Sequence, residues 1–418
     1  MPVYYVDNVN GCDENDGLSP EKAKSDHAKI DVRAGDTLLF KRGTIYRQRL
    51  TTFEGSAGAW ITYGAYGAGA PPVFCGSTDV SKREDWVEID KNIWECKKEI
   101  PGETGNFEFD KNNCTATLRW SRDELCAQGD FWDSRLKGDT FYPLKESLPP
   151  QQVLLCSFGN PADVYSHIEC ISRNERVLSA PKPYNRYSGL CFRNSGLHGI
   201  AGKADHVEII NCIFENIGGC AWNNEREIRL GNGVEFYGHG SYILIEGCRF
   251  KNIYDSCITH QGPGAKTVPA REFICRSNVF DTYSMAAFEY RDKMPIDSAF
   301  IGNTCLNAGC GFGMLGESIP RKSEIWPKPM GHHVFMWRIP EAENGGGLKI
   351  EGNFFGEAKH GAAIYSIISP EAESQVKMDK NMYMSGNSLL IRWSGKDFSS
   401  LEEYSAATGQ DKNSIYIK

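Results

Sequence analysis

VEIINCIFENI (207–217) is the first of six segments that share one shape, and their repetition decides the fold. Each reads apolar-x-apolar, then a small or polar residue, then Cys or Asn, with an aromatic or apolar residue two places on. The other five are ILIEGCRFKNI (243–253), EFICRSNVFDT (272–282), SAFIGNTCLNA (298–308), LKIEGNFFGEA (348–358) and VKMDKNMYMSG (376–386). Such repetition is typical of solenoids, in which each repeat packs only against its neighbours.

The repeated Cys or Asn marks one corner of each repeat. It falls at Cys212, Cys248, Asn278, Asn303, Asn353 and Asn381, so successive steps are 36, 30, 25, 50 and 28 residues. A shortest step near 25 residues predicts a coil of three short strands, with insertions at one corner. Asn suits a turn because it adopts left-handed backbone angles and hydrogen-bonds its own chain. Alternation alone also fits a sandwich, but the fixed motif and irregular period favour an all-β parallel β-helix solenoid.

Charge and hydropathy exclude two classes of partner. The chain has 46 basic and 54 acidic residues, a net charge of −8, whereas nucleic-acid binding needs a basic face. No apolar stretch reaches 18 residues, so we expect no membrane span. The N-terminus lacks the basic start and apolar run of a signal peptide. We therefore expect a cytoplasmic protein, or a secreted one if a leader has been removed.

The 15 cysteines form no C-x-x-C pair, which argues against metal-site and small disulfide-scaffold spacings. Several lie within apolar strand patterns, so we interpret them as buried thiols that act as small hydrophobes. Unpaired thiols in this number favour a reducing compartment. We expect no metal and no cofactor, and His332-His333 has no other ligand spacing to support a metal site.

The N-terminal part has a different character from the repeats. It contains YYVD (4–7), a D-N-D-G turn, AGDTLLFKRGTIYR (34–47) and WITYGAYGAGAPPVF (60–74). This opening resembles the start of bacterial right-handed β-helix proteins of the pectate-lyase-like superfamily. The resemblance implies a right-handed coil and a carbohydrate-active protein, since many members are glycoside hydrolases, polysaccharide lyases or uronate epimerases.

We expect one structural domain with four parts. Residues 1–75 form an N-terminal cap and the first coils. Residues 76–170 continue the first coils and contain a long inserted excursion. Residues 171–396 form the β-helix coils, with an insertion at 309–347 that arches over a groove, and 397–418 form a C-terminal cap. In the excursion, Trp132 is a candidate for one wall of a substrate groove, unless it only attaches the excursion to the coils.

Unusual polar residues gather in three successive coils, within 223–240, 254–262 and 288–292. The motif R-L-G-N-G-V-E-F followed by D-S-C-I-T-H-Q looks like a pattern of β-helix carbohydrate-active proteins. The resemblance implies a groove lined by Arg229, Asn232, Glu235, Asp255, Thr259, Gln261 and Glu289, with His260 less secure. The alternative is that these residues are solvated surface of the solenoid.

Glycoside hydrolysis needs two carboxylic groups, one to protonate the leaving oxygen and one to attack the sugar or activate water. Our hypothesis takes Asp255 and Glu289 as this pair, with Glu235 in reserve. Arg229 and Arg291 would lower the pKa of one carboxylate. Asn232, Thr259, Gln261 and His260 would bind sugar hydroxyls, and His239 and His260 are candidate proton carriers.

Two other functions compete with hydrolysis. A lyase or epimerase acting on a uronate needs a cation to neutralise the acid and a base to remove a proton. Arg229, His260, Tyr290 and Arg291 are candidates for those roles. The third possibility is a non-catalytic carbohydrate-binding β-helix. The expected partner in every case is an oligosaccharide or polysaccharide, and the oligomeric state stays open.

Overall fold

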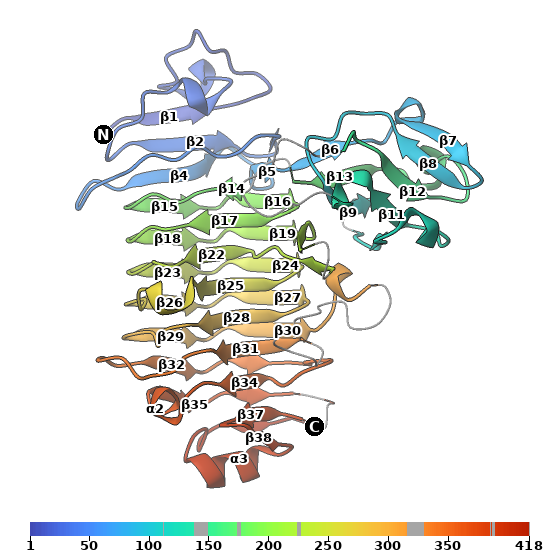
Figure 1. The fold of residues 1–418 in the computed structure, drawn as a ribbon. Helices are drawn as coiled ribbons and strands as arrows, with labels where there is room; N and C mark the ends of the chain where they lie inside the picture. Colours follow the sequence, from blue (N-terminus) through green and yellow to red (C-terminus); the bar gives the residue numbers. More distant parts are fainter. Residues whose placement is uncertain are drawn as a thin grey trace.

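The chain winds into a right-handed parallel β-helix, which confirms the fold predicted from the repeats (Figure 1). The computed structural model describes residues 1–111, 113–137, 149–173, 177–223, 227–315, 330–384, 386 and 389–417. Each full coil contributes one strand to each of three sheets. Neighbouring strands within these sheets pair in parallel, with the exception of the last pair, β37 and β38.

Sheet 1 follows the order β1 (Val3–Val6), β2 (Thr37–Lys41), β4 (Ile61–Tyr66), β15 (Asn185–Ser188), β18 (Val207–Ile210), β23 (Ile243–Glu246), β26 (Phe273–Arg276), β29 (Ser298–Ile301), β32 (Leu348–Glu351) and β35 (Val376–Asp379). Sheet 2 follows β3 (Ile45–Tyr46), β5 (Val73–Cys75), β16 (Cys191–Ser195), β19 (Ile213–Ile217), β24 (Arg249–Ile253), β27 (Val279–Tyr283), β30 (Thr304–Ala308), β33 (Phe354–Phe355), β36 (Met382–Tyr383) and β39 (Ile415–Tyr416). Sheet 3 follows β14 (Val177–Ser179), β17 (His198–Gly202), β22 (Val234–Tyr237), β25 (Ser256–Gln261), β28 (Ala286–Arg291), β31 (His332–Trp337), β34 (Ile364–Ile367), β37 (Ile391–Trp393) and β38 (Lys396–Phe398).

The repeated Cys or Asn forms a continuous buried ladder at the corner between sheets 1 and 2. The Oδ1 atoms of Asn278, Asn303, Asn353 and Asn381 each accept a hydrogen bond from the backbone N–H of the ladder residue one coil before, at 2.9–3.0 Å. We predicted that the ladder residue itself would have left-handed backbone angles. The left-handed residue is instead the one before it, such as Asn211 (φ 52°) or Gly302 (φ 61°). The ladder Asn therefore stabilises the corner through its side-chain hydrogen bonds and not through its own backbone angles.

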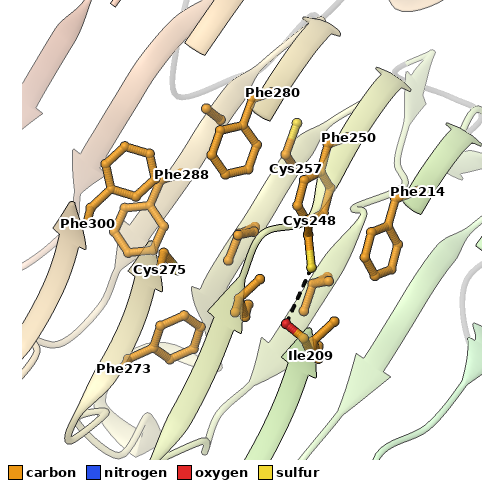
Figure 2. Close-up of a cluster of buried hydrophobic side chains, with 14 of the residues drawn as sticks. Ile209, Phe214, Cys248, Phe250, Cys257, Phe273, Cys275, Phe280, Phe288 and Phe300 are labelled. Atoms are coloured by element: carbon orange, nitrogen blue, oxygen red, sulfur yellow. Dashed lines mark hydrogen bonds between the residues drawn. The ribbon is translucent and has the colours of Figure 1, made fainter. Parts of the chain in front are cut away.

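Apolar side chains of successive coils stack inside the column (Figure 2). Phe214, Phe250 and Phe280 occupy equivalent positions of sheet 2, with ring centroids 4.7 and 5.0 Å apart. Cys248, Cys257 and other thiols fill the spaces between rings, and burial raises the pKa of the Cys257 thiol well above its ordinary value. The cysteines of the repeats are thus core residues.

We expected the excursion within residues 76–170, and its strands run from Ser77 to Ser172. Its strands are β6 (Ser77–Asp79), β7 (Trp86–Asp90), β8 (Ile93–Cys96), β9 (Thr104–Phe109), β10 (Thr117–Leu118), β11 (Asp130–Asp133), β12 (Val153–Cys156) and β13 (Ile168–Ser172). They form a five-stranded and a three-stranded sheet beside the column, and most of their apolar residues pack in a core of their own (Figure 1). The excursion begins after β5 of sheet 2 and returns to β14 of sheet 3.

Two further insertions leave the column at this same corner between sheets 2 and 3. One contains the hairpin of β20 (Ala221–Asn223) and β21 (Ile228–Arg229), between β19 and β22. The other begins after β30 and returns to β31. The predicted insertion 309–347 is therefore wrong as a single segment, because His332–Trp337 alternates inward and outward residues and pairs with β28 and β34. Residues 316–329, where the expected arch would lie, are outside the described residues.

Short helices occur at the ends of the column and in the loops. The α-helices are α1 (Pro161–Val164), α2 (Pro370–Glu373) and α3 (Leu401–Thr408), and the 3-10 helices are η1 (Pro20–Lys22), η2 (His27–Lys29), η3 (Arg83–Asp85), η4 (Arg122–Glu124), η5 (Ser134–Lys137), η6 (Gly264–Lys266) and η7 (Phe312–Met314). Helix α3 lies at the C-terminal end of the column (Figure 1), where Leu401 and Tyr404 join the core. Among the helices of the described segments, none has the length and apolar character that crossing a membrane requires.

Candidate active site on the outer face of sheet 3

The outer face of sheet 3 carries two glutamates in one ladder. Side chains alternate along a strand, so Val234 and Phe236 point into the core while Glu235 points outward. Glu235 pairs with Thr259 on β25, and Thr259 pairs with Glu289 on β28. The two glutamates are therefore separated by two strand spacings, about 10 Å between backbones. Glu235 and Glu289 are only 8% and 2% exposed, respectively.

Both carboxylate oxygens of Glu289 accept hydrogen bonds. Oε2 accepts from the Ser256 hydroxyl at 2.8 Å, and Oε1 accepts from the Trp337 indole N–H at 2.8 Å. The Arg291 Nε lies 3.4 Å from Oε1, and the guanidinium lies over the Trp337 ring at 4.9 Å. Glu289 is thus fixed by two hydrogen-bond donors and one cation, all buried or half-buried.

Glu235 is held mainly by neutral donors. Its Oε2 accepts from the side-chain amides of Asn232 at 2.6 Å and Gln261 at 2.5 Å. The Nδ1 of His198, on β17, lies 3.8 Å from the same oxygen. This Nδ1 accepts a hydrogen bond from the backbone N–H of Asn232 at 3.0 Å, so a neutral His198 carries its proton on Nε2.

Asn232 and Ser256 connect the two glutamates. The backbone N–H of Ser256 donates to Asn232 Oδ1 at 3.0 Å, while the Ser256 hydroxyl donates to Glu289. A single hydrogen-bonded path therefore runs from Glu235 through Asn232 and Ser256 to Glu289. Such a network fixes the relative position of the two carboxylates.

Asp255 lies in the turn immediately before β25. Its backbone N–H donates to Gly231 O at 3.1 Å, and its carbonyl accepts from Met285 N–H at 3.2 Å. This position is at the corner between sheets 2 and 3, where the three insertions leave the column, and Asp255 is 5% exposed. It is one residue from Ser256 but does not share the outward ladder of Glu235 and Glu289.

His260 and Tyr290 do not face a substrate. They are neighbours of Thr259 and Glu289 in sequence, so alternation turns them inward, where their rings stack with centroids 5.1 Å apart. Burial lowers the pKa of His260 to about 3. The sequence hypothesis that His260 binds sugar or carries protons is therefore wrong, and Tyr290 is excluded as a lyase base for the same reason.

Arg229 and Trp132 are also surrounded by other parts of the protein. Arg229 donates to the carbonyls of Gly219 and Gly105, both at 2.5 Å, and so connects the hairpin to the excursion. Trp132 is 5% exposed within the excursion core. Neither supports the predicted substrate-binding role. His239 pairs with Asp205 at 2.8 Å and is more exposed than the ladder residues.

Sequence reasoning missed His198, Ser256 and Trp337. Trp337 was assigned to an insertion, and His198 lies outside the six quoted segments, in a strand whose HGIAG sequence shows little apolar alternation. Ser256 was within the quoted cluster, but alternate positions counted back from Thr259 reach Cys257, a core residue, and not Ser256, so the pattern did not indicate the contact of Ser256 with Glu289.

No group of His, Cys, Asp and Glu side chains that could hold a metal ion occurs within the described ranges.

No family model and no curated protein matches the chain. Among solved structures it is similar to the GH136 lacto-N-biosidase from Eubacterium ramulus, with a TM-score of 0.49, 13% identity and coverage of 100% of this chain. The chain spans 66% of that protein's length. It is also similar to pectate lyase Pel9A, with a TM-score of 0.48, 13% identity and coverage of 95% of this chain and 74% of that one. A third similar structure is the family 28 exopolygalacturonase of Yersinia enterocolitica, with a TM-score of 0.37 and 13% identity. The similarity covers 92% of this chain and 71% of that one.

Proposed function

We propose that the protein is a carbohydrate-active enzyme, a glycoside hydrolase, and that Glu235 and Glu289 are its catalytic pair. The observation that carries this proposal is their shared outward ladder, with only Thr259 between them. Hydrolysis needs a proton donor and a base or nucleophile on either side of the glycosidic bond. Our sequence hypothesis held Glu235 in reserve, and its position opposite Glu289 now favours it over Asp255.

The surroundings suggest different roles for the two carboxylates. Glu289 faces Arg291 and accepts hydrogen bonds on both oxygens, as an ionised carboxylate does. We assign it the role of base or nucleophile. Glu235 has amide donors on one oxygen only, so we assign it the proton transfer to the leaving group. A backbone separation of about 10 Å is closer to the wider carboxylate spacing of inverting enzymes, roughly 6.5–9.5 Å, than to the narrower one.

A lyase acting on a uronate is the alternative. One arrangement on the same face fits it: Tyr365 is in the ladder of Glu289, and its hydroxyl accepts a hydrogen bond from Arg392. Burial, however, raises the pKa of Tyr365, which Arg392 only partly opposes. Arg392 is also paired with Asp397. These observations favour the hydrolase.

Products distinguish the two reactions. The protein is incubated with panels of neutral and uronic-acid oligosaccharides, and reducing ends and ultraviolet absorbance are both recorded. Hydrolysis releases reducing ends without new absorbance. Absorbance from unsaturated products contradicts the hydrolase.

Removal of either carboxylate is the first testable prediction. Glu289→Gln and Glu235→Gln should each lower kcat by about 10²- to 10⁴-fold, because the amide can neither accept nor donate the transferred proton. Glu246→Gln, on the outer face of sheet 1, is the matched control and should keep wild-type activity. Circular dichroism verifies folding of all three variants. Wild-type turnover in Glu289→Gln would remove that residue from the mechanism.

A further inference from the structure

Two buried polar atoms lack a partner on β25, the strand that lies between the strands of the two proposed catalytic glutamates. Thr259 is fully buried and Gln261 is 6% exposed, and both face outward from β25. Within the described residues, neither the Thr259 hydroxyl oxygen nor Gln261 Oε1 forms a hydrogen bond. A buried polar atom without a partner is costly, so such atoms are usually satisfied by another group. Their position identifies them as candidates for ligand contacts.

The orientation of Gln261 determines what its oxygen requires. Its amide N–H donates to Glu235 Oε2, which assigns Nε2 to that side and leaves Oε1 as an acceptor. Only a hydrogen-bond donor can satisfy Oε1. A sugar hydroxyl can donate to it, whereas a carboxylate of a uronic acid can only accept. The Thr259 hydroxyl can donate or accept, which suits a second sugar hydroxyl.

The arginines on this face lie beside acids, although Arg291 Nε forms no hydrogen bond within the described residues. Arg291 lies 3.4 Å from Glu289, Arg338 pairs with Asp292 at 2.9 Å, and Arg392 pairs with Asp397. A bound carboxylate would have to compete with these acids for its counter-ion. It would also enter a site that already contains the carboxylates of Glu235 and Glu289.

From these observations we infer that the sugar unit bound between Glu235 and Glu289 is neutral, and that its hydroxyls bond to Gln261 Oε1 and to Thr259. This inference rests on the proposed function and specifies its substrate class. The neighbouring donors and acceptors recognise hydroxyl groups, and each nearby arginine already faces a carboxylate of the protein.

Matched substrates test the inference. Oligosaccharides of galactose, glucose and mannose, with and without N-acetylated units, are compared with those of galacturonic, glucuronic and mannuronic acid. Hydrolysis of one or more neutral members and of no uronic member is the expected result. Hydrolysis of a uronic member would overturn the inference while leaving the catalytic pair standing. Failure to hydrolyse any member would instead contradict the proposed function itself.

Variants of Thr259 separate ligand contact from structural support. With the best neutral substrate of that panel, Thr259→Val should raise KM by about 2- to 10-fold, the effect of losing one hydrogen bond. Its melting temperature should stay the same or rise, because valine removes a buried hydroxyl that has no protein partner. Thr259→Ser should restore most of the lost affinity. An unchanged KM in Thr259→Val, or a lower melting temperature, would overturn the assignment.

Discussion

Glu235 and Glu289 have equivalent positions on their strands but different neighbours, and the neighbours define their chemistry. Glu289 lies between Ser256, Trp337 and Arg291, whereas Glu235 lies among amides. Asn232 has a central place because it contacts Glu235 directly and Glu289 through Ser256. The residue that holds Asn232 is His198, through the backbone N–H. We therefore regard His198 as a positioning residue.

Truncation of His198 tests this role. His198→Ala removes the acceptor for the Asn232 N–H, so the network loosens and kcat should fall by about 10- to 100-fold, since small misplacements of catalytic groups are costly. KM should change less. His198→Asn offers a side-chain oxygen in place of Nδ1 and should recover most of kcat. Equal loss in both variants would contradict a purely positioning role, and steady-state kinetics with the best substrate of the panel measures the difference.

At the scale of strands and turns, the sequence predicted the coils well and the site only in part. The apolar rows and the Asn ladder repeat locally, so they can be recognised in one segment after another. The site residues depend on inward or outward alternation within sheet 3, and one step along β25 separates Thr259 from His260 in the core. The position of Trp337 on sheet 3 could not be predicted, because the long insertion before β31 interrupts the spacing by which successive strands are recognised. Pairing register, which the sequence does not state, decides which acids are neighbours.

The Asn ladder makes a prediction about stability. Asn303 accepts from the Asn278 N–H and donates to the Cys275 carbonyl at 3.1 Å, all within the buried corner. Asn303→Ala leaves both groups without a partner and should lower the free energy of unfolding by about 2–4 kcal/mol. The exposed Asn413→Ala variant should cost less than about 1 kcal/mol. Urea denaturation measures both, and similar losses would show that the ladder adds nothing specific.

At the scale of the whole molecule, the excursion, the hairpin and the insertion after β30 all leave the column at the corner between sheets 2 and 3. Two of them, the excursion and the hairpin, contact each other there through buried polar groups. Glu103, just before β9 of the excursion, accepts a hydrogen bond from Ala221 N–H of the hairpin at 2.5 Å and lies 3.5 Å from Arg173. Arg229 of the hairpin donates to Gly105 of the excursion. The excursion and the hairpin are therefore attached to each other beside the outer face that carries the proposed catalytic pair.

This attachment should make stability depend on pH through Glu103. Burial raises its pKa from 4.5 to about 7, and Arg173 only partly opposes the shift. A folded-state pKa above the unfolded value means that the folded protein holds the proton more tightly. The contribution to stability is therefore complete below about pH 4.5 and is lost as the pH rises through about 7.

Glu103→Gln removes this titration while keeping an oxygen for the Ala221 N–H. The unfolding free energy of the wild type, relative to the variant, should fall by about 3 kcal/mol between pH 4.5 and 8, since each unit of pKa shift corresponds to about 1.4 kcal/mol. Urea titrations at several pH values measure the difference, with the exposed Glu99→Gln variant as the control for removal of one charge. A difference between wild type and Glu103→Gln that does not change with pH would mean that Glu103 is not held in its protonated form by the folded corner.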